Sequence, residues 1–313
     1  MKRRIQNLNQ PLGRKGARRR VRTRTALLLF LTAMAGTVLM GLLGGFVPEG
    51  VRVWLGAIAS VAFFALPAYL GLCEIDGDQT RLLSLRRLSG AQVLWLAASG
   101  ALLICPATLM NDVMAALAAR FAAAFGMQAA AAAAQSAGSA SLLLPMLLAS
   151  GILAPVCEEV FFRGYLQGAF ARYGAVQASI VTALLFAAVH GLGAGLLVYA
   201  LLGLVFSAFV LRMGSVLASV MLHTAYNMTL IVLSALPLSA LFTGLTPVGC
   251  LVRLLGCAVL GYTAKRAWLA RGAREGKPEA LSVSKKEMLL AIAVLLLVLL
   301  AQVTAVLAAG GNA

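Results

Sequence analysis

Charged side chains are scarce in this sequence: they make up 12% of its 313 residues, and only ten residues are acidic. Hydrophobic residues instead make up 61%. A soluble domain carries about 25% charged and about 45–50% apolar residues. The low charge excludes a water-soluble fold, and we expect an all-α protein embedded in a bilayer, where helices satisfy their own backbone groups.

Cysteine and histidine are few as well. Five cysteines are scattered along the chain without a CxxC pair, which excludes a disulfide framework, and we interpret them as small buried apolar residues. They are Cys73, Cys105, Cys157, Cys250 and Cys257. The two histidines do not form the HExxH helix that is typical of many zinc proteases.

Apolar runs long enough to cross a bilayer, about 20 residues each, fill most of the chain. We count nine: 25–47, 52–73, 91–111, 141–170, 176–191, 193–212, 215–236, 247–264 and 288–309. The sequence therefore predicts a polytopic transmembrane helical bundle with about nine spans, or with eight as the alternative.

Basic residues give the chain a formal net charge of +16, but their distribution indicates a membrane and not nucleic acid. Ten of the 26 Lys and Arg residues precede residue 25, where no acidic residue occurs. By the positive-inside rule the N terminus should be cytoplasmic. Nine spans would then leave 23 basic residues inside and three outside, with the C terminus outside. We expect a multi-pass protein of the plasma membrane. Its expected partner is the lipid bilayer, and we expect it to bind no nucleic acid.

Two adjacent glutamates interrupt the fourth apolar run, between Leu148 and Phe161. One carboxylate at the centre of a membrane helix costs about 2.5 to 3.5 kcal/mol on the insertion scale, so Glu158 and Glu159 need a function or a tight pairing. Neighbouring helical residues project about 100° apart, so the two glutamates should have different tasks.

Arg163 offers one of these glutamates a partner. It follows Glu159 by four residues, the acid-first spacing at which helical side chains of opposite charge attract. We therefore expect Glu159 and Arg163 to form a structural ion pair, which leaves Glu158 to face another helix. Pro155 is expected to kink the helix just before the glutamates.

The two histidines of the chain lie at the depth of Glu158. Counted from the cytoplasmic turns at about 1.5 Å per residue, Glu158 lies about 21 Å along its helix and His190 about 24 Å. On the seventh run, His223 lies about 14 Å and Asn227 about 20 Å from its turn. The four polar groups are thus expected to share one membrane depth.

This combination of groups suits peptide hydrolysis. A carboxylate and an imidazole in a low-dielectric cavity can deprotonate a water, while a second imidazole and a carboxamide can donate to a developing oxyanion. A plainer interpretation is that His223 and Asn227 only hydrogen-bond neighbouring helices, each bond contributing about 0.6 kcal/mol on average. The common depth of all four groups favours the catalytic interpretation.

Three ordered motifs resemble those of the CPBP intramembrane proteases, a group that contains type II CAAX prenyl endopeptidases and bacterial bacteriocin-processing or immunity proteins. The motifs are EEVFFR at 158–163, FAAVH at 186–190 and HTAYN at 223–227, which follow the patterns EExxxR, FxxxH and HxxxN. The resemblance covers about residues 142–235, roughly a third of the chain.

The resemblance implies an intramembrane endopeptidase in which Glu158 and His190 activate the hydrolytic water and His223 and Asn227 stabilise the oxyanion. The group is described both as a metalloprotease and as a glutamic protease family. A divalent metal such as zinc would need about three protein ligands, for which Glu158, His190 and His223 are the candidates. The histidines lie on different helices, so we favour a metal-free site.

Four regions follow along the chain. They are a basic cytoplasmic arm (1–24), N-terminal spans with an external loop (25–140), the catalytic core (141–236) and C-terminal spans (237–313). Ala33 and Ala35 resemble a signal-peptidase site, but the apolar run continues to Phe46, so an uncleaved signal anchor is the better interpretation. The composition is typical of a bacterial protein, so we expect a peptide or membrane-protein substrate and not a prenylated one. The oligomeric state is left open.

Other functions compete with this one. Glu and His at the membrane midplane also form proton relays, as in a proton-coupled transporter. The sequence shows no inverted repeat or paired broken helices, which counts against transport. A catalytically silent immunity or scaffold protein is the third alternative. A cysteine protease at Cys157 is disfavoured, because that thiol projects about 100° from Glu158 and is a weak nucleophile in apolar surroundings.

Overall fold

The computed structural model describes residues 23–73, 85–124, 140–191 and 195–270, and these residues form helices and no named β-strand. Seven helical segments in this part of the chain are long and apolar enough to cross a membrane. They are Thr23–Gly44, Glu49–Cys73, Gly90–Phe121, Leu143–Phe170, Leu196–Met213, Val216–Ser234 and Pro247–Leu269. An eighth apolar helix, Ala175–Val189, is shorter. The predicted all-α polytopic bundle is confirmed; the predicted span at 288–309 and nearly all of the arm at 1–24 lie outside the described residues.

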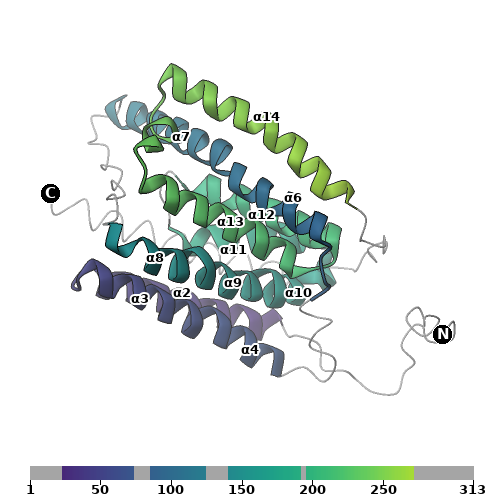
Figure 1. Ribbon diagram of the computed structural model, residues 1–313. Helices are drawn as coiled ribbons and strands as arrows, with labels where there is room; N and C mark the ends of the chain where they lie inside the picture. Colours follow the sequence, from purple (N-terminus) through teal and green to yellow (C-terminus); the bar gives the residue numbers. More distant parts are fainter. Residues whose placement is uncertain (1–22, 74–84, 125–139, 192–194, 271–313) are drawn as a thin grey trace, which may run out of the picture.

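The helices stack in layers, with the fourth span, Leu143–Phe170, between two of them (Figure 1). The first layer holds α2 (Thr23–Gly44), α3 (Glu49–Ser60) and α4 (Leu66–Cys73), with the π-helical turn η1 (Val61–Ala65) between the last two. It packs on the fourth span, which runs through α8 (Leu143–Met146), α9 (Ala154–Glu159) and α10 (Gln167–Phe170). Beyond this span lie α11 (Ala175–Val189), α12 (Leu196–Met213) and α13 (Val216–Ser234). On the far side of α13 lie α6 (Gly90–Leu102), α7 (Ile104–Ala124) and α14 (Pro247–Leu269).

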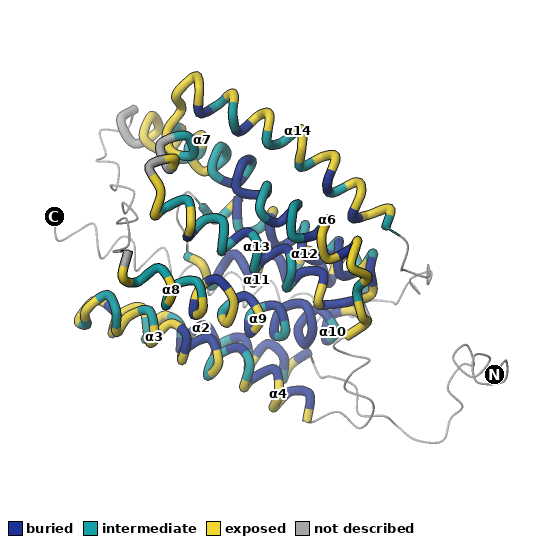
Figure 2. The backbone as a smooth tube through the Cα atoms, in the orientation of Figure 1, coloured by how far each residue is buried: buried dark blue, intermediate teal, exposed yellow. Residues whose placement is uncertain are grey.

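Burial follows this layering. The dark blue, buried stretches concentrate on α9 to α13, whereas α14 and the outer faces of α2 and α3 are largely exposed (Figure 2). Exposed leucines on those outer helices are what a lipid-facing surface requires, because lipid tails are as apolar as leucine. The polar side chains of the fourth span are therefore enclosed by protein and not by lipid.

Helix ends carry recognisable capping signals. α6 begins with a capping box in which Ser89 Oγ accepts from the Gln92 amide at 3.3 Å and Gln92 Oε1 accepts from the Ser89 amide at 2.9 Å. α14 begins with Pro247 after Thr246, whose hydroxyl accepts from the Gly249 amide. These caps satisfy amides that lack an intrahelical partner.

The third span extends beyond its predicted end. It was expected to end near residue 111 and to be followed by an external loop containing a helical piece, but α7 continues to Ala124, because its alanine-rich second half strongly favours helix. The predicted fifth run at 176–191 coincides within two residues with α11, which has 15 residues. At about 1.5 Å per residue it is shorter than the roughly 30 Å hydrocarbon core. The chain can thus turn at His190 within the membrane depth, helped by a positive φ of 100° at Gly191.

Arg253, one of the three basic residues expected outside the membrane or at its outer edge, is fully buried in the protein. Its Nη1 lies 2.6 Å from Asp112 Oδ2, its Nε donates to the carbonyl of Gly249 at 3.1 Å, and its Nη2 donates to the carbonyl of Gly244. A buried guanidinium is tolerated only with such pairing. The cluster joins α7 to the start of α14.

Candidate active site

Glu158 and Glu159 lie on a short α-helix between two wider turns. α9 is preceded by η3 (Leu147–Leu153) and followed by η4 (Val160–Leu166), both of which are π-helical. In η3 the Ala154 amide donates to the carbonyl of Ala149, five residues earlier. The distortion expected at Pro155 thus takes the form of π-helical turns on both sides of α9, a feature that is frequent at functional sites.

Glu159 and Arg163 form a fully buried ion pair, with Arg163 Nη1 2.8 Å from Glu159 Oε1. The guanidinium also donates from Nη2 to the carbonyl of Gly203 on α12 at 3.2 Å. Its central carbon lies 4.4 Å from the centre of the Phe186 ring, a favourable cation–π distance. The structure therefore holds the expected i,i+4 pair and anchors it to two further helices.

Glu159 has a second partner that the sequence did not indicate. Its Oε1 lies 2.9 Å from Nδ1 of His223 on α13, so the same oxygen accepts from both the guanidinium and the imidazole. Sequence reasoning assigned Glu159 to Arg163 alone, because spacing along one helix says nothing about contacts with another. The expected ion pair therefore also contacts a residue predicted for the site.

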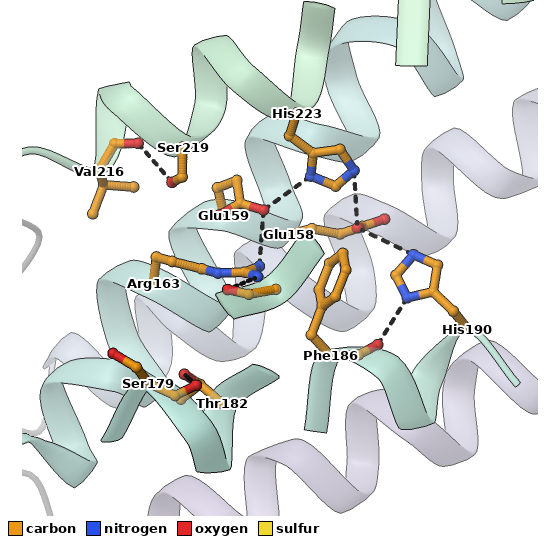
Figure 3. Close-up of polar contacts among 11 residues, drawn as sticks. Glu158, Glu159, Arg163, Ser179, Thr182, Phe186, His190, Val216, Ser219 and His223 are labelled. Carbon is orange, nitrogen blue, oxygen red and sulfur yellow. Dashed lines mark hydrogen bonds and ion pairs between the residues drawn. The ribbon is translucent and has the colours of Figure 1, made fainter. Parts of the chain in front are cut away.

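Glu158 faces both histidines (Figure 3). Its Oε2 lies 3.7 Å from His190 Nε2 and 4.0 Å from His223 Nε2. The exposed fraction is 13% for the Glu158 side chain, 24% for His190 and 5% for His223, so the group is shielded but reachable on the His190 side. Three of the four residues predicted for the site are thus brought together.

Backbone and carboxylate partners orient both imidazoles. His190 Nδ1 lies 2.8 Å from the carbonyl oxygen of Phe186, which can only accept a hydrogen bond, so Nδ1 must carry the proton. In the neutral ring Nε2 is then an acceptor that faces Glu158. His223 likewise directs Nδ1 to the Glu159 carboxylate and Nε2 to Glu158.

Asn227 lies one helical turn beyond His223 on α13, and its Nδ2 donates to the carbonyl of Ser150 at 3.0 Å. The π-helical register of η3 explains why this carbonyl is available. In a π-helix each carbonyl accepts from the amide five residues later. For Ser150 that residue is Pro155, and proline has no N–H. Pro155 thus leaves the Ser150 carbonyl to hold the carboxamide, while the second N–H of Nδ2 stays available.

Aromatic rings enclose the two imidazoles. The His190 ring lies 4.4 Å, between centroids, from both Phe186 and Tyr199. The His223 ring stacks on Phe206 at 5.0 Å. Phe186 belongs to a recognised motif, whereas Tyr199 and Phe206 were missed. Their seven-residue separation on α12, which puts them on one helix face, is the sequence signal that could have found them.

The segment that holds this site matches a known family. Residues 140–229 match the family model described as type II CAAX prenyl endopeptidase Rce1-like. The chain carries an Rce1-like domain. Its matched segment contains all six residues singled out from the sequence: Glu158, Glu159, Arg163, His190, His223 and Asn227.

The Rce1-like domain confirms the resemblance to CPBP intramembrane proteases and supports an intramembrane endopeptidase of the CAAX type. Together with the seven apolar helices it supports a multi-pass membrane protein. No curated protein matches the chain.

The candidate ligands of a divalent metal were Glu158, His190 and His223. Among the described residues, no group of three or more His, Cys, Asp and Glu side chains is arranged to hold a metal ion. The metal-free site favoured from the sequence stays a prediction, and the chemistry proposed below uses these side chains themselves.

Proposed function

We propose that the Rce1-like domain is the catalytic unit of an intramembrane endopeptidase that hydrolyses a peptide bond in a peptide or membrane-protein substrate. The observation that carries this proposal is the place of Glu158 Oε2. This atom is buried and has no hydrogen-bond partner among the described residues, yet two imidazole nitrogens lie 3.7 and 4.0 Å away. A buried acceptor without a donor costs about 1–3 kcal/mol, which favours a functional over a structural role.

Water activation is assigned to Glu158 and His190. The 3.7 Å between Glu158 Oε2 and His190 Nε2 is too long for a direct hydrogen bond. A water placed about 2.8 Å from each atom would donate one proton to each, and its oxygen lone pairs would then face the substrate. Because both acceptors compete for its protons, the water becomes a better nucleophile.

Oxyanion stabilisation is assigned to His223 and Asn227. His223 donates there only if Nε2 also carries a proton, and the resulting imidazolium would be held by the Glu159 carboxylate at Nδ1. Asn227 would donate its second N–H while the Ser150 carbonyl holds the first. Donors fixed before the reaction need no reorganisation when charge develops on the carbonyl oxygen.

The reaction consumes one water. Its oxygen forms a bond to the scissile carbonyl carbon as its proton passes to Glu158, and the carbonyl electrons move to the oxyanion. When the oxyanion collapses, the C–N bond breaks and the proton held by Glu158 passes to the leaving nitrogen. The products are a carboxylic acid and an amine, and the enzyme returns to its starting protonation state.

The orientation proposed for the protein places the N terminus in the cytoplasm and the chain in the plasma membrane. It is supported by the basic residues that precede residue 25. A substrate would reach the site on the side of His190, which is the most exposed of the three grouped side chains.

Comparative peptide proteomics tests the proposal. Cells with the wild-type chain and cells with Glu158→Gln are compared for cleaved peptides in the membrane and secreted fractions. Glu158→Gln keeps the shape of the side chain and removes its basicity. We expect a set of cleavage products that depends on Glu158, and purified wild-type protein should reproduce those cleavages on synthetic peptides.

Glu49→Gln serves as the matched control, because Glu49 lies in the first turn of α3, outside the site. Product levels should match wild type in that variant. Identical peptide profiles in wild type and Glu158→Gln, at equal abundance of the two proteins, would contradict the proposed activity.

A further inference from the structure

We propose that Tyr199 is a positioning residue that holds the imidazole of His190 with Nε2 facing Glu158. Tyr199 lies on α12, outside the three motifs that define the site. Its catalytic consequence rests on the proposed function, whereas its effect on the His190 ring does not.

The contact is a stacked ring pair. The Tyr199 and His190 centroids are 4.4 Å apart and the ring planes differ by 25°. Phe186 also lies 4.4 Å from the His190 ring, at an interplanar angle of 47°. The imidazole is therefore in contact with two aromatic rings, one from its own helix and one from α12.

His190 needs such support because of where it lies in the chain. It is the C-terminal capping residue of α11, and Gly191 follows with a positive φ of 100°. Its side chain is 24% exposed, and its one hydrogen bond in the described part of the chain, from Nδ1 to the Phe186 carbonyl, fixes the ring at one edge only. A stacking partner restricts the tilt that a single hydrogen bond leaves open.

The Tyr199 ring lies over the preceding turn of its own chain. A Cβ added at Gly195 would lie 3.1 Å from Tyr199 Cε2, so the glycine leaves space for this ring. An imidazole that tilts away from Glu158 would lose the spacing in which a water can bridge the two groups.

Nuclear magnetic resonance tests the placement without reference to activity. The chain has only two histidines, so full-length protein labelled with 13C at the histidine ring and held in lipid nanodiscs gives two ring signals. His190→Gln and His223→Gln assign them. A ring proton above an aromatic face is shielded, so Tyr199→Leu should reduce the upfield shift of the His190 signal, with the part due to Phe186 remaining, and leave the His223 signal in place.

Tyr199→Phe separates the ring from the hydroxyl, and we expect it to keep both the His190 signal and most of the activity. In Tyr199→Leu, kcat should fall about 2- to 12-fold with KM unchanged, since an aromatic pair contributes that much beyond area burial. Combined with His190→Gln, Tyr199→Leu should cause no further loss. Tyr262→Leu on α14 is the matched control, because Tyr262 is 57% exposed and packs edge-on against Trp95, away from the site.

A His190 signal that is unchanged in Tyr199→Leu would overturn the inference. Equal loss of activity in Tyr199→Phe and Tyr199→Leu would overturn it as well, because the hydroxyl would then be the active group. If no Glu158-dependent cleavage is found, the proposed function fails, and the two histidine signals still decide whether Tyr199 holds His190.

Discussion

His223 and Glu159 are hydrogen-bonded across the bundle, with His223 Nδ1 2.9 Å from Glu159 Oε1. Arg163 binds the same oxygen at 2.8 Å. Through this one atom the buried ion pair reaches an imidazole that also faces Glu158. Substitutions at Glu159 should therefore affect both folding and the site.

Removing one member of the pair should lower the stability of the protein. Breaking a buried ion pair costs about 3–5 kcal/mol because it leaves an uncompensated charge. We expect Arg163→Ala to reduce the abundance of the protein in the membrane and to lower its thermal unfolding midpoint in detergent. An Arg163→Ala protein that accumulates and unfolds like wild type, and loses only turnover, would instead assign Arg163 to substrate binding.

Replacing both members by apolar residues separates the two roles of Glu159. Such a replacement is often neutral for stability, so Glu159→Leu combined with Arg163→Met should recover much of the unfolding midpoint lost in Arg163→Ala. Activity should stay low, because His223 has lost the acceptor at Nδ1. Recovery of activity along with stability would show that Glu159 acts only as the partner of Arg163.

Asn227 should be more important for turnover than for folding. Loss of one of two oxyanion donors lowers kcat by about 100- to 1000-fold, and we expect this range for Asn227→Ala at normal abundance. Steady-state kinetics on a cleaved peptide would measure it. A less than 10-fold loss would remove Asn227 from the oxyanion site.

Pro155→Ala acts on Asn227 indirectly. It supplies an amide that can bond the Ser150 carbonyl and compete with Asn227 Nδ2, so we expect a smaller fall in kcat with KM little changed. Pro247→Ala is its control, since Pro247 is the first residue of α14 after the N-cap Thr246, where an amide has no intrahelical acceptor. Equal kinetic effects of the two proline variants would contradict this role of Pro155.

Gly203 should tolerate no side chain. A Cβ there would lie 2.9 Å from Ala183 Cα and 3.2 Å from Arg163 Nη2. We expect Gly203→Ala to destabilise the protein by about 1–3 kcal/mol, the usual range for overpacking, as measured by thermal unfolding in detergent. A Cβ added at Gly56 on α3 would meet no described atom within 4 Å, so Gly56→Ala should be neutral or mildly stabilising.

Treatment with a chelator distinguishes water activation by Glu158 and His190 from water activation by a bound metal. We expect activity on a peptide substrate to survive treatment with a chelator, and the purified protein to hold no stoichiometric metal. Metal content is measured by mass spectrometry before and after treatment. Stoichiometric zinc whose removal abolishes activity and whose return restores it would replace the proposed base pair by a metal centre, with Glu158, His190 and His223 as its ligands.

Much of the fold could be predicted from local sequence. An apolar helix in lipid satisfies its own backbone groups, so length and composition are enough to predict it. The end of α7 was harder to predict, because alanine-rich sequence continues a helix equally well inside and outside the bilayer. The polar residues themselves stood out, since buried charge is rare in a membrane helix.

The sequence by itself determined that this is a helical membrane protein and which polar side chains require partners, since both follow from the free energy of placing each residue in lipid. Only the tertiary structure decided which atoms meet. His223 lies at Glu159 as well as at Glu158, Asn227 at the Ser150 carbonyl, and Tyr199 on the His190 ring. Each of these contacts joins different helices, and their geometry is set by the packing of whole helices and by the π-helical turns around α9, which no local spacing encodes.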